Sequence, residues 1–304
     1  MSSVTIIPRG WQATDIPDQT GKNFLITGGT SGLGKATAME LARAGAHVTI
    51  TARSATKGAA TVAEIASDRV DYKLLDLADL SSVRSFAKEF ATPIDTLILN
   101  AGVMATPFSL TKDNFEMQFG TNHLGHFALA GLLQKQIKHR VVGVSSQAHR
   151  MSRIGNFTID EMRNKAKGIG AYNPWSTYAF SKLANLLFIH ELERRQMRNN
   201  WNLEAVAAHP GYADTNLVAD ATVQDRAGAL ANAIFAQSAE RGALPTLCAA
   251  TYPGLYGASY IGPDGFLEMR GFPKLTRAAA IAYDQRLAKD LWSVSEELTG
   301  VVWG

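Results

Sequence analysis

From Asn23 onward, short apolar runs alternate with longer stretches in which apolar residues recur at helical spacing. The runs have the length and β-branched content of buried strands, and the longer stretches have the period of amphipathic helices. The predicted strands span residues 24–26, 46–51, 70–75, 94–99, 140–145, 203–208 and 256–261. The predicted helices begin near Gly34 and then span residues 56–66, 79–91, 111–137, 175–198, 225–250 and 276–297. This alternation predicts an α/β fold, in which a doubly wound parallel sheet of about seven strands carries helices on both faces.

The pattern contains no break that would divide the chain into separate domains. Residues 1–22, which include Trp11 and two prolines, follow no regular period and are predicted to form an irregular leader. Residues 23–304 are predicted to form a single catalytic domain. An insertion at 147–174 interrupts this domain, and residues 210–304 complete it on the substrate side.

The first predicted strand runs into a glycine-rich turn, Thr27-Gly28-Gly29-Thr30-Ser31-Gly32-Leu33-Gly34. Gly28 permits a sharp turn, Gly32 lets the backbone approach a diphosphate, and Gly34 lets the next helix pack closely on the sheet. The amino terminus of that helix attracts phosphate charge. The glycine spacing differs from the common dinucleotide fingerprint, and a glycine-rich turn that binds nothing is the alternative. The predicted cofactor contacts here are Gly28, Thr30, Ser31, Gly32, Leu33 and Gly34.

The end of the second predicted strand indicates which dinucleotide is bound. A protein that binds NAD usually places a carboxylate there, about 20 residues past the glycines. This chain has no Asp or Glu between Glu40 and Glu64, and it carries Arg53 and Ser54 at that position. A guanidinium and a hydroxyl suit a 2′-phosphate. We therefore predict NADP(H) as cofactor, with the alternative that Arg53 is a solvated surface residue.

Tyr178 and Lys182 lie four residues apart on a predicted helix, so they share one helix face. An unperturbed tyrosine has a pKa of about 10, which is too high for a base near neutral pH. A lysine ammonium nearby offers enough stabilisation to lower that pKa by about three units. The pair can therefore move a proton to or from a carbinol oxygen. The pattern Tyr-x-x-x-Lys on its own, however, often occurs by chance.

Together with the residues between them, these two features resemble the short-chain dehydrogenase/reductase family over about residues 22–220, and the resemblance implies a Rossmann fold. Five further motifs resemble those of the family, namely Asp76-Leu77 as the adenine contact, Asn100-Ala101-Gly102 after the fourth strand, Asn122 and Ser146 of the catalytic tetrad, and Pro210-Gly211 with Thr215 at the nicotinamide. The resemblance implies that Tyr178 is the general acid and base, that Lys182 lowers its pKa and binds the nicotinamide ribose, and that Ser146 binds the substrate oxygen. It also implies that Asn122 holds a water that links Lys182 to solvent. Ser145 is the alternative to Ser146.

The spacing of Ser146 and Tyr178 departs from that of short family members, since 32 positions separate them instead of about a dozen. This insertion and the segments 122–127 and 181–185 resemble the branch of retinol dehydrogenases and protochlorophyllide reductases. His123 and His126 have no third ligand nearby in sequence, so we expect hydrogen-bonding or packing roles and no metal. His209 is expected to be structural and to lead into the turn at Pro210.

Composition limits the classes of partner. The net charge is +3 without a long basic run, which does not favour nucleic acid. Cys248 is the single cysteine, and the sequence shows neither a signal peptide nor an apolar run that could span a membrane. We therefore expect a cytoplasmic protein, monomer or homo-oligomer.

The loops that follow the predicted strands are mostly apolar, which suggests a bulky hydrophobic carbonyl or alcohol as substrate. The apolar residues are Val103, Met104, Pro107, Phe108, Met151, Ile154, Phe157, Tyr172, Trp175, Tyr212, Leu217 and Val218. Packing of the insertion is the alternative role for these side chains. The alternative functions are an NADP(H)-binding regulator without turnover, a light-dependent protochlorophyllide-type reductase, and a sugar-nucleotide epimerase.

Overall fold

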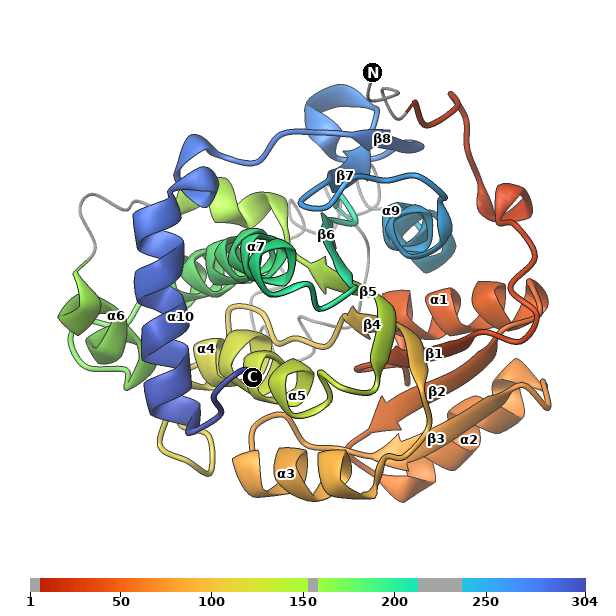
Figure 1. Ribbon diagram of the computed structural model, residues 1–304. Helices are drawn as coiled ribbons and strands as arrows, with labels where there is room; N and C mark the ends of the chain where they lie inside the picture. Colours follow the sequence, from red (N-terminus) through yellow and green to blue (C-terminus); the bar gives the residue numbers. More distant parts are fainter. Residues whose placement is uncertain (1–5, 153–157, 213–236) are drawn as a thin grey trace, which may run out of the picture.

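One eight-stranded sheet separates two layers of helices in the computed structural model, which describes residues 6–152, 158–212 and 237–304 (Figure 1). The strands are β1 (Asn23–Ile26), β2 (His47–Ala52), β3 (Val70–Leu74), β4 (Ile94–Leu99), β5 (Ile137–Val144), β6 (Glu204–Ala208), β7 (Tyr260–Pro263) and β8 (Pro273–Leu275). The α-helices are α1 (Gly32–Arg43), α2 (Ala55–Ile65), α3 (Leu80–Glu89), α4 (Met117–Phe119), α5 (Gly125–Leu132), α6 (Ile159–Ala166), α7 (Pro174–Asn199), α9 (Ala239–Thr251) and α10 (Gln285–Thr299). Shorter helical turns are η1 (Ala13–Asp15), the π-helix η2 (Gly120–Leu124), η3 (Gln147–Met151), η5 (Phe266–Glu268) and η6 (Ala280–Tyr283).

The strand order within the sheet is β3-β2-β1-β4-β5-β6-β7-β8. All neighbouring strands are parallel except β7 and β8, which are antiparallel. The chain therefore moves outward from β1 to β3 and then returns to pair β4 with the other side of β1. Ligands of open parallel sheets bind beyond the carboxyl ends of the strands at such a reversal. The predicted doubly wound sheet is confirmed, and β8 adds an antiparallel edge strand that the sequence pattern did not indicate.

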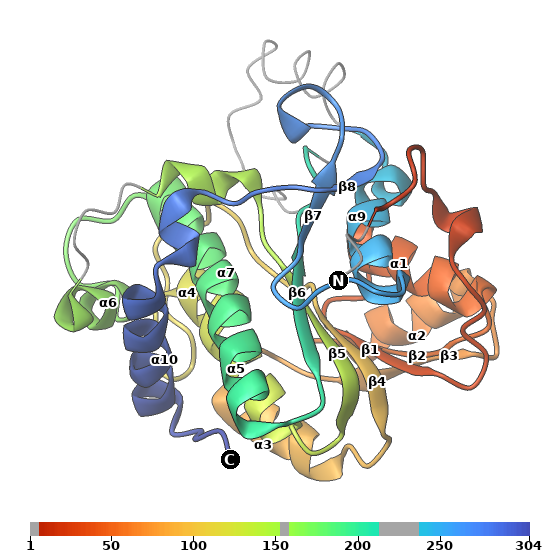
Figure 2. The same ribbon diagram turned by 45° about the horizontal axis from the view of Figure 1, so that its top comes forward.

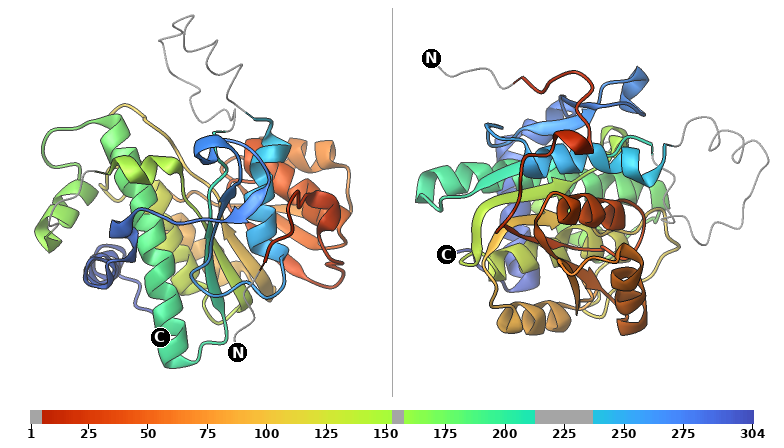
Figure 3. Two further views of the ribbon diagram at one scale, coloured as in Figure 1. Left: turned by 90° about the horizontal axis from the view of Figure 1, so that it is seen from above. Right: turned by 90° about the vertical axis from the view of Figure 1, so that its right-hand side faces the viewer.

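Two hydrophobic cores fill the spaces between the sheet and its helices. The larger core lies under α3, α5 and α7 and includes Phe127, Leu187 and Trp292. The smaller core lies under α1 and α9 and includes Leu41 and Leu247. Figure 2 shows these layers on opposite sides of the sheet, and Figure 3 shows from above that α10 lies beside α7, away from the strands. Among the described helices, none combines the length and apolarity needed to cross a bilayer.

The described part of the leader, residues 6–22, is irregular apart from η1 and packs against the smaller core. The Trp11 side chain is only 2% exposed and belongs to that core. The Tyr252 hydroxyl donates a hydrogen bond of 2.8 Å to the Ile6 carbonyl, and the Gln19 amide N–H donates one of 2.8 Å to the Ala44 carbonyl. These contacts fasten the segment to the ends of α9 and α1.

Both boundaries of the helix predicted at 111–137 are wrong. Residues before Met117 form a turn in which the Phe115 N–H donates to the Thr111 hydroxyl and Asn114 has a φ of +63°. The Glu116 carboxylate then accepts hydrogen bonds from the N–H groups of Gln118 and Phe119, so it caps a helix that begins only at Met117. At the other end α5 stops at Leu132, and β5 already begins at Ile137.

The carboxyl-terminal elements also differ from the prediction. The strand expected at 256–261 is β7, which begins only at Tyr260, and the helix expected at 276–297 is split into η6 and α10. The split occurs because the Asp284 carboxylate caps α10 by accepting from the Leu287 N–H. The insertion at 147–174 contains η3 and α6. Residues 225–236 of the helix expected at 225–250 lie outside the described residues, and α9 occupies the rest.

Replacing Trp11 with Ala is expected to lower the free energy of unfolding by about 3–5 kcal/mol, because the substitution leaves a cavity in the smaller core. Urea unfolding followed by circular dichroism measures this change. Ile6→Ala is the matched control, because the Ile6 side chain is 74% exposed in the same segment. A Trp11→Ala variant as stable as the control would show that the leader does not stabilise the domain.

Candidate active site

The carboxyl ends of six parallel strands bring the predicted site residues to one edge of the sheet. Six of the predicted motifs each follow a different strand within two residues of its end. The glycine turn follows β1, Arg53 and Ser54 follow β2, Asp76 and Leu77 follow β3, Asn100 to Gly102 follow β4, Ser146 follows β5, and Pro210 and Gly211 follow β6. Asn122 lies in η2 and Tyr178 and Lys182 lie in α7, while Thr215 lies outside the described residues.

The glycine turn has the backbone geometry expected of a diphosphate cradle. Gly28 and Gly32 have φ values of +68° and +48°, which side chains disfavour. A Cβ atom at Gly34 would lie 2.3 Å from the Gly28 carbonyl oxygen, so only glycine permits this contact between helix and turn. Ser31 precedes α1 without capping it through its side chain, and the first turn carries no acidic residue. The first N–H groups of α1 therefore suit an anion.

The segment after β2 offers a cationic group near this turn. The Arg53 side chain is exposed, and no ion pair joins it to any residue in the described ranges. Ser54 is the residue before α2 and makes no capping bond through its hydroxyl. Both groups fit the 2′-phosphate of NADP(H). After the next strand, β3, the Asp76 carboxylate accepts from the Ala78 N–H at 2.9 Å, while the Leu77 side chain is buried against Gly125.

The Thr27 hydroxyl joins the glycine turn to the segment after β4. Its Oγ1 atom accepts hydrogen bonds from the N–H groups of Asn100 at 2.9 Å and Ala101 at 3.0 Å. In return, the Asn100 side-chain amide donates to the carbonyls of Thr27 at 2.9 Å and Gly28 at 3.2 Å. The ends of β1 and β4 are therefore interlocked at the reversal of strand order.

His126 extends this link to the helix that carries Asn122. Its Nδ1 lies 3.0 Å from the Asn122 carbonyl, and its Nε2 lies 2.8 Å from Thr27 Oγ1. A carbonyl can only accept, so Nδ1 carries the proton and the neutral Nε2 accepts from the Thr27 hydroxyl. Burial lowers the pKa of His126 to about 4 and thereby maintains this neutral form. His123 bonds to the Ser295 hydroxyl, so both histidines have the hydrogen-bonding roles expected of them.

Asn122 occupies the π-helical turn η2, in which the Gly125 N–H donates to the Gly120 carbonyl. Its side-chain Oδ1 accepts from the Val103 N–H at 2.8 Å, and its Nδ2 donates to the Val103 carbonyl and the Ser181 hydroxyl at 2.9 Å. A Cβ atom at Gly102 would lie 3.1 Å from Asn122 Oδ1 and 3.4 Å from Lys182 Nζ. A side chain at position 102 would therefore crowd both Asn122 and Lys182.

The hydroxyls of Ser145 and Ser146 have different partners. Ser145 Oγ is buried and donates to the Lys182 carbonyl at 2.8 Å. Ser146 Oγ accepts from the Ala148 N–H at 3.2 Å, and Ser146 is the serine whose hydrogen bonding lowers the pKa of Tyr178. The pKa of Tyr178 thus responds to Ser146 and not to Ser145.

Tyr178 and Lys182 are both at least 95% buried. Burial raises the pKa of Tyr178 to about 12, although the bond to Ser146 opposes this shift. Burial also lowers the pKa of Lys182 to about 8, and its Nζ donates to the Val144 carbonyl at 3.2 Å. Lys182 Nζ lies 5.8 Å from the Tyr178 ring centroid. Burial therefore determines the direction of the pKa shift of Tyr178, and the expected lowering of this pKa by Lys182 is not seen in this structure.

The turn after β6 is held by His209, which is completely buried. Its Nδ1 accepts from the Gly211 N–H at 3.2 Å, and Gly211 has a φ of +74°. His209 has the structural role at the Pro210 turn that the sequence indicated. In the part of the chain that the structure describes, no three His, Cys, Asp or Glu side chains gather as metal ligands would.

Two loops form one wall beside Tyr178, and we call residues 103–110 and 168–175 the substrate wall. Gln118 joins them, since its Oε1 accepts from the Ala105 N–H at 2.8 Å and its Nε2 donates to the Tyr172 hydroxyl at 2.9 Å. The Phe108 and Tyr172 rings pack edge to face. Trp175, which is about half exposed, lies with its ring centroid 6.3 Å from that of Tyr178. Ile154, Phe157, Leu217 and Val218 of the expected lining lie outside the described residues.

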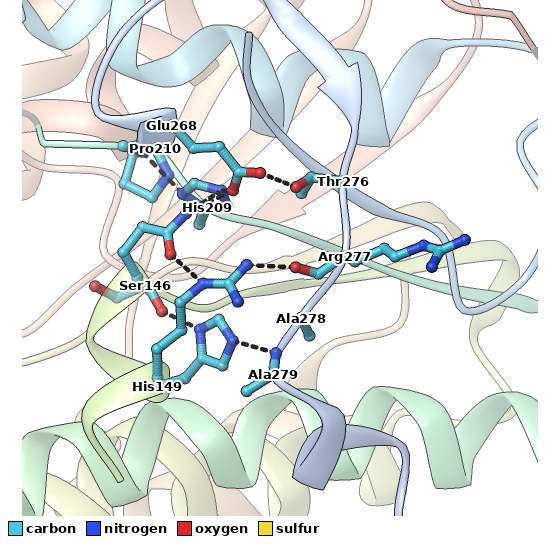
Figure 4. Close-up of polar contacts among 12 residues, drawn as sticks. Ser146, His149, His209, Pro210, Glu268, Thr276, Arg277, Ala278 and Ala279 are labelled. Atoms are coloured by element: carbon cyan, nitrogen blue, oxygen red, sulfur yellow. Dashed lines mark hydrogen bonds and ion pairs between the residues drawn. The ribbon is translucent and has the colours of Figure 1, made fainter. Parts of the chain in front are cut away.

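The sequence analysis did not predict three residues near the site. Two of them, His149 and Glu268, are shown in Figure 4, and the third is Gln147, which bonds to Glu268. His149 Nδ1 donates to the Ser146 carbonyl at 2.6 Å, and its Nε2 accepts from the Ala279 N–H at 3.0 Å. These residues lie in no motif, and the segment that supplies Glu268 is far away in sequence. The adjacency of Gln147 to Ser146 was the one signal that could have been followed.

Comparison with known proteins identifies the family. A model of the short chain dehydrogenase family matches residues 22–158. Mouse retinol dehydrogenase 12 is 36% identical to the chain, and the match covers 93% of this chain and 88% of that protein. The chain belongs to the short-chain dehydrogenase/reductase family. It is an oxidoreductase in the retinol dehydrogenase-like branch of that family.

Solved structures agree with this assignment. A crystal structure of an uncharacterized protein from Mycobacterium paratuberculosis has a TM-score of 0.83 and 42% identity, and the match covers 97% of this chain and 99% of that chain. The NADP complex of RhlG from Pseudomonas aeruginosa has a TM-score of 0.62 and 21% identity, with 82% of this chain and 97% of that chain covered. The second likeness shows the shared fold.

Acidification is expected to destabilise the protein between pH 6.5 and pH 4 because of His126. Its pKa of about 4 in the folded state lies below the unfolded value of 6.5, so the unfolded chain binds more protons in this window and stability falls as pH falls. The shift corresponds to on the order of 3 kcal/mol at pH 4. Urea unfolding at several pH values measures the slope.

His126→Gln is expected to reduce this slope, because glutamine can bond to Asn122 and Thr27 without titrating. His47→Gln is the control, since the His47 side chain is exposed at the start of β2. An unchanged slope in His126→Gln would contradict the assigned role of the buried imidazole.

Proposed function

We propose that the chain is an NADP(H)-dependent oxidoreductase that transfers a hydride between nicotinamide and a hydrophobic carbonyl or alcohol, with Tyr178 as general acid and base. One observation carries this proposal. Two ionisable side chains, Tyr178 and Lys182, are buried together at the carboxyl edge of the sheet, with Lys182 Nζ 5.8 Å from the Tyr178 ring centroid, and Ser146 lowers the pKa of the phenol. Buried ionisable groups without a structural salt bridge are typical of catalytic sites.

The protonation states suit reduction of a carbonyl. With a pKa of about 12, the Tyr178 phenol holds its proton at neutral pH and can donate it to a developing alkoxide. Ser146 Oγ offers a second hydrogen bond to the same oxygen, and Lys182, with a pKa of about 8, is mostly an ammonium that stabilises the resulting phenolate. The bound cofactor supplies the hydride. In the oxidative direction the same phenol must first lose its proton, which the Lys182 ammonium favours.

The choice of NADP(H) rests on the segment after β2. Arg53 is exposed next to the glycine turn, and no carboxylate stands between Glu40 and Glu64 to bind ribose hydroxyls. We propose that Arg53 and Ser54 bind the 2′-phosphate, that the glycine turn and the first turn of α1 bind the diphosphate, and that Asp76, Leu77, Asn100, Pro210 and Gly211 complete the cofactor site.

The substrate class is proposed from exposed apolar side chains in the segments at this edge of the sheet, of which Trp175 lies beside Tyr178. Phe108 and Trp175 of the substrate wall and Met151 of η3 are each about half exposed, so they present apolar area without being packed into the core. Such surfaces favour bulky apolar ligands. The name of the mouse relative, retinol dehydrogenase 12, points to a substrate of this class for that protein.

Tyr178→Phe is expected to lower kcat by at least about 100-fold, because it removes the proton donor, while the ring keeps its packing against Trp175. The affinity for NADPH, measured by fluorescence titration, should stay within about twofold. Turnover is measured as NADPH oxidation with a panel of apolar aldehydes, cyclic ketones and quinones.

Tyr256→Phe serves as the control for this substitution, because Tyr256 is 45% exposed and precedes the amino end of β7, opposite the carboxyl edge of the sheet. Unchanged turnover in Tyr178→Phe would contradict the proposed mechanism. If the wild-type protein binds NADPH but reacts with no member of the panel in either direction, the chain is a cofactor-binding regulator.

Arg53→Glu is expected to reverse the cofactor preference. The carboxylate repels a 2′-phosphate and can bind ribose hydroxyls, so kcat/KM for NADPH should fall roughly 10- to 100-fold relative to NADH. Steady-state rates with both cofactors measure the ratio. Lys88→Glu, in the last turn of α3, makes the same charge change elsewhere and should leave the ratio unaltered. An unaltered ratio in Arg53→Glu would show that another group selects the cofactor.

A further inference from the structure

The carboxylate of Glu268 lies where three segments of the chain meet (Figure 4). Its Oε2 accepts hydrogen bonds from Gln147 Nε2 at 2.5 Å and from His209 Nε2 at 3.1 Å. Its Oε1 accepts from the Thr276 hydroxyl. Gln147 directly follows Ser146, and His209 directly precedes Pro210. A single side chain from the β7–β8 connection therefore joins the segment of the proposed substrate-binding serine to the turn after β6.

The polar atoms around the carboxylate have only one consistent arrangement. His209 Nδ1 accepts from the Gly211 N–H, so in the neutral ring Nε2 carries the proton and donates to Glu268. Gln147 Oε1 accepts from Arg150 Nε at 2.7 Å, so its amide nitrogen faces the carboxylate. The two nitrogens, His209 Nε2 and Gln147 Nε2, lie 3.3 Å apart, and both are donors. Without the carboxylate between them, two N–H groups would face each other.

The surrounding backbone and charge show that this contact is built into the fold. Leu267 and Glu268 have φ values of +49° and +56°, a conformation that side chains adopt rarely. Hydrogen bonds from His209 and Thr276 hold the pKa of Glu268 at about 2 despite partial burial, so the carboxylate remains ionised across the working range. Charge-assisted bonds are shorter and stronger than neutral ones and fix geometry more firmly.

We propose that Glu268 is a positioning residue, which holds Ser146 and the Pro210–Gly211 turn at a fixed separation through Gln147 and His209. This inference rests on the proposed function, in which Ser146 binds the substrate oxygen and the turn contacts the nicotinamide. Hydride transfer requires the substrate and the nicotinamide to be held close together, and a displacement of about 1 Å can lower the rate about 100-fold. Glu268 touches neither ligand and acts through its two partners.

The test compares Glu268→Ala with the conservative Glu268→Gln. The glutamine oxygen can still accept from Gln147 and His209, and its amide nitrogen can donate to the Thr276 hydroxyl. We expect Glu268→Ala to lower kcat roughly 10- to 100-fold and to change KM for NADPH by less than about threefold. Glu268→Gln should recover kcat to within about fivefold of wild type.

Glu297→Ala is the matched control, because the Glu297 carboxylate is exposed on α10 and pairs with Arg163 at 2.6 Å. A second readout does not depend on turnover. The ring nitrogens of His209, assigned by comparison with His209→Gln, are followed by ¹⁵N NMR. We expect a protonated Nε2 in wild type and in Glu268→Gln, and a mixture of tautomers in Glu268→Ala.

The outcomes separate the two proposals. A wild-type protein without turnover in either direction overturns the proposed function, and the positioning role falls with it. An active wild type with equal kcat in Glu268→Ala overturns the positioning role alone. The positioning role is also overturned if Glu268→Ala and Glu268→Gln lower kcat equally, because a positioning contact requires rescue by the glutamine amide. It is likewise overturned if wild type, Glu268→Ala and Glu268→Gln have the same His209 tautomer.

Discussion

The hydroxyl of Thr27 is the point on which the candidate site depends. This one buried oxygen accepts from the backbone of two residues after β4 and donates to the His126 imidazole, which in turn bonds to the Asn122 carbonyl. The glycine turn, the segment after β4 and the π-helical turn are thereby fixed relative to one another by directed hydrogen bonds. The chain is directional, because the backbone N–H groups can only donate and the Asn122 carbonyl can only accept, which determines the proton positions on Thr27 and His126.

Burial explains both the organisation and the chemistry of the site. Tyr178, Lys182 and Asn122 are removed from water, so each polar atom must find a partner or change its protonation state. Asn122 is satisfied by Val103 and Ser181, whereas the tyrosine and the lysine have shifted pKa values. Hydrogen bonds thus hold Asn122 in place, whereas burial determines the protonation of Tyr178 and Lys182.

The sequence predicted the parts of the molecule that local pattern determines. Periodicity predicts the seven parallel strands and α7. Residue spacing indicates the glycine turn and the pair Tyr178 and Lys182. The predicted helix boundaries were wrong where a capping side chain determines the first residue of the helix. Glu116 and Asp284 cap helices that begin later than the apolar pattern suggests. The antiparallel β8 was missed because three residues are too few to establish a period.

The residues that support the site could not be predicted, because their partners are distant in sequence. Glu268 meets Gln147 across 121 positions and His209 across 59. Neither the composition of its segment nor its spacing indicates that a carboxylate will lie there. Likewise, His126 could be expected to form hydrogen bonds, but the identity of its partner Thr27 depends on the strand order.

The π-helical turn separates two halves of one continuous helical segment. Before it, Glu116 and Gln118 bond to the substrate wall, and after it, His126 bonds to the cofactor side of the sheet. The two halves meet at Asn122, whose side chain bonds to Val103 at the start of the wall and whose carbonyl accepts from His126. The contacts of Glu116 and Gln118 with the wall do not reach this junction. Under the proposed function, mutations in the wall beyond Val103 can therefore change the substrate range without breaking a hydrogen bond on the cofactor half, so that the two properties can evolve at different rates.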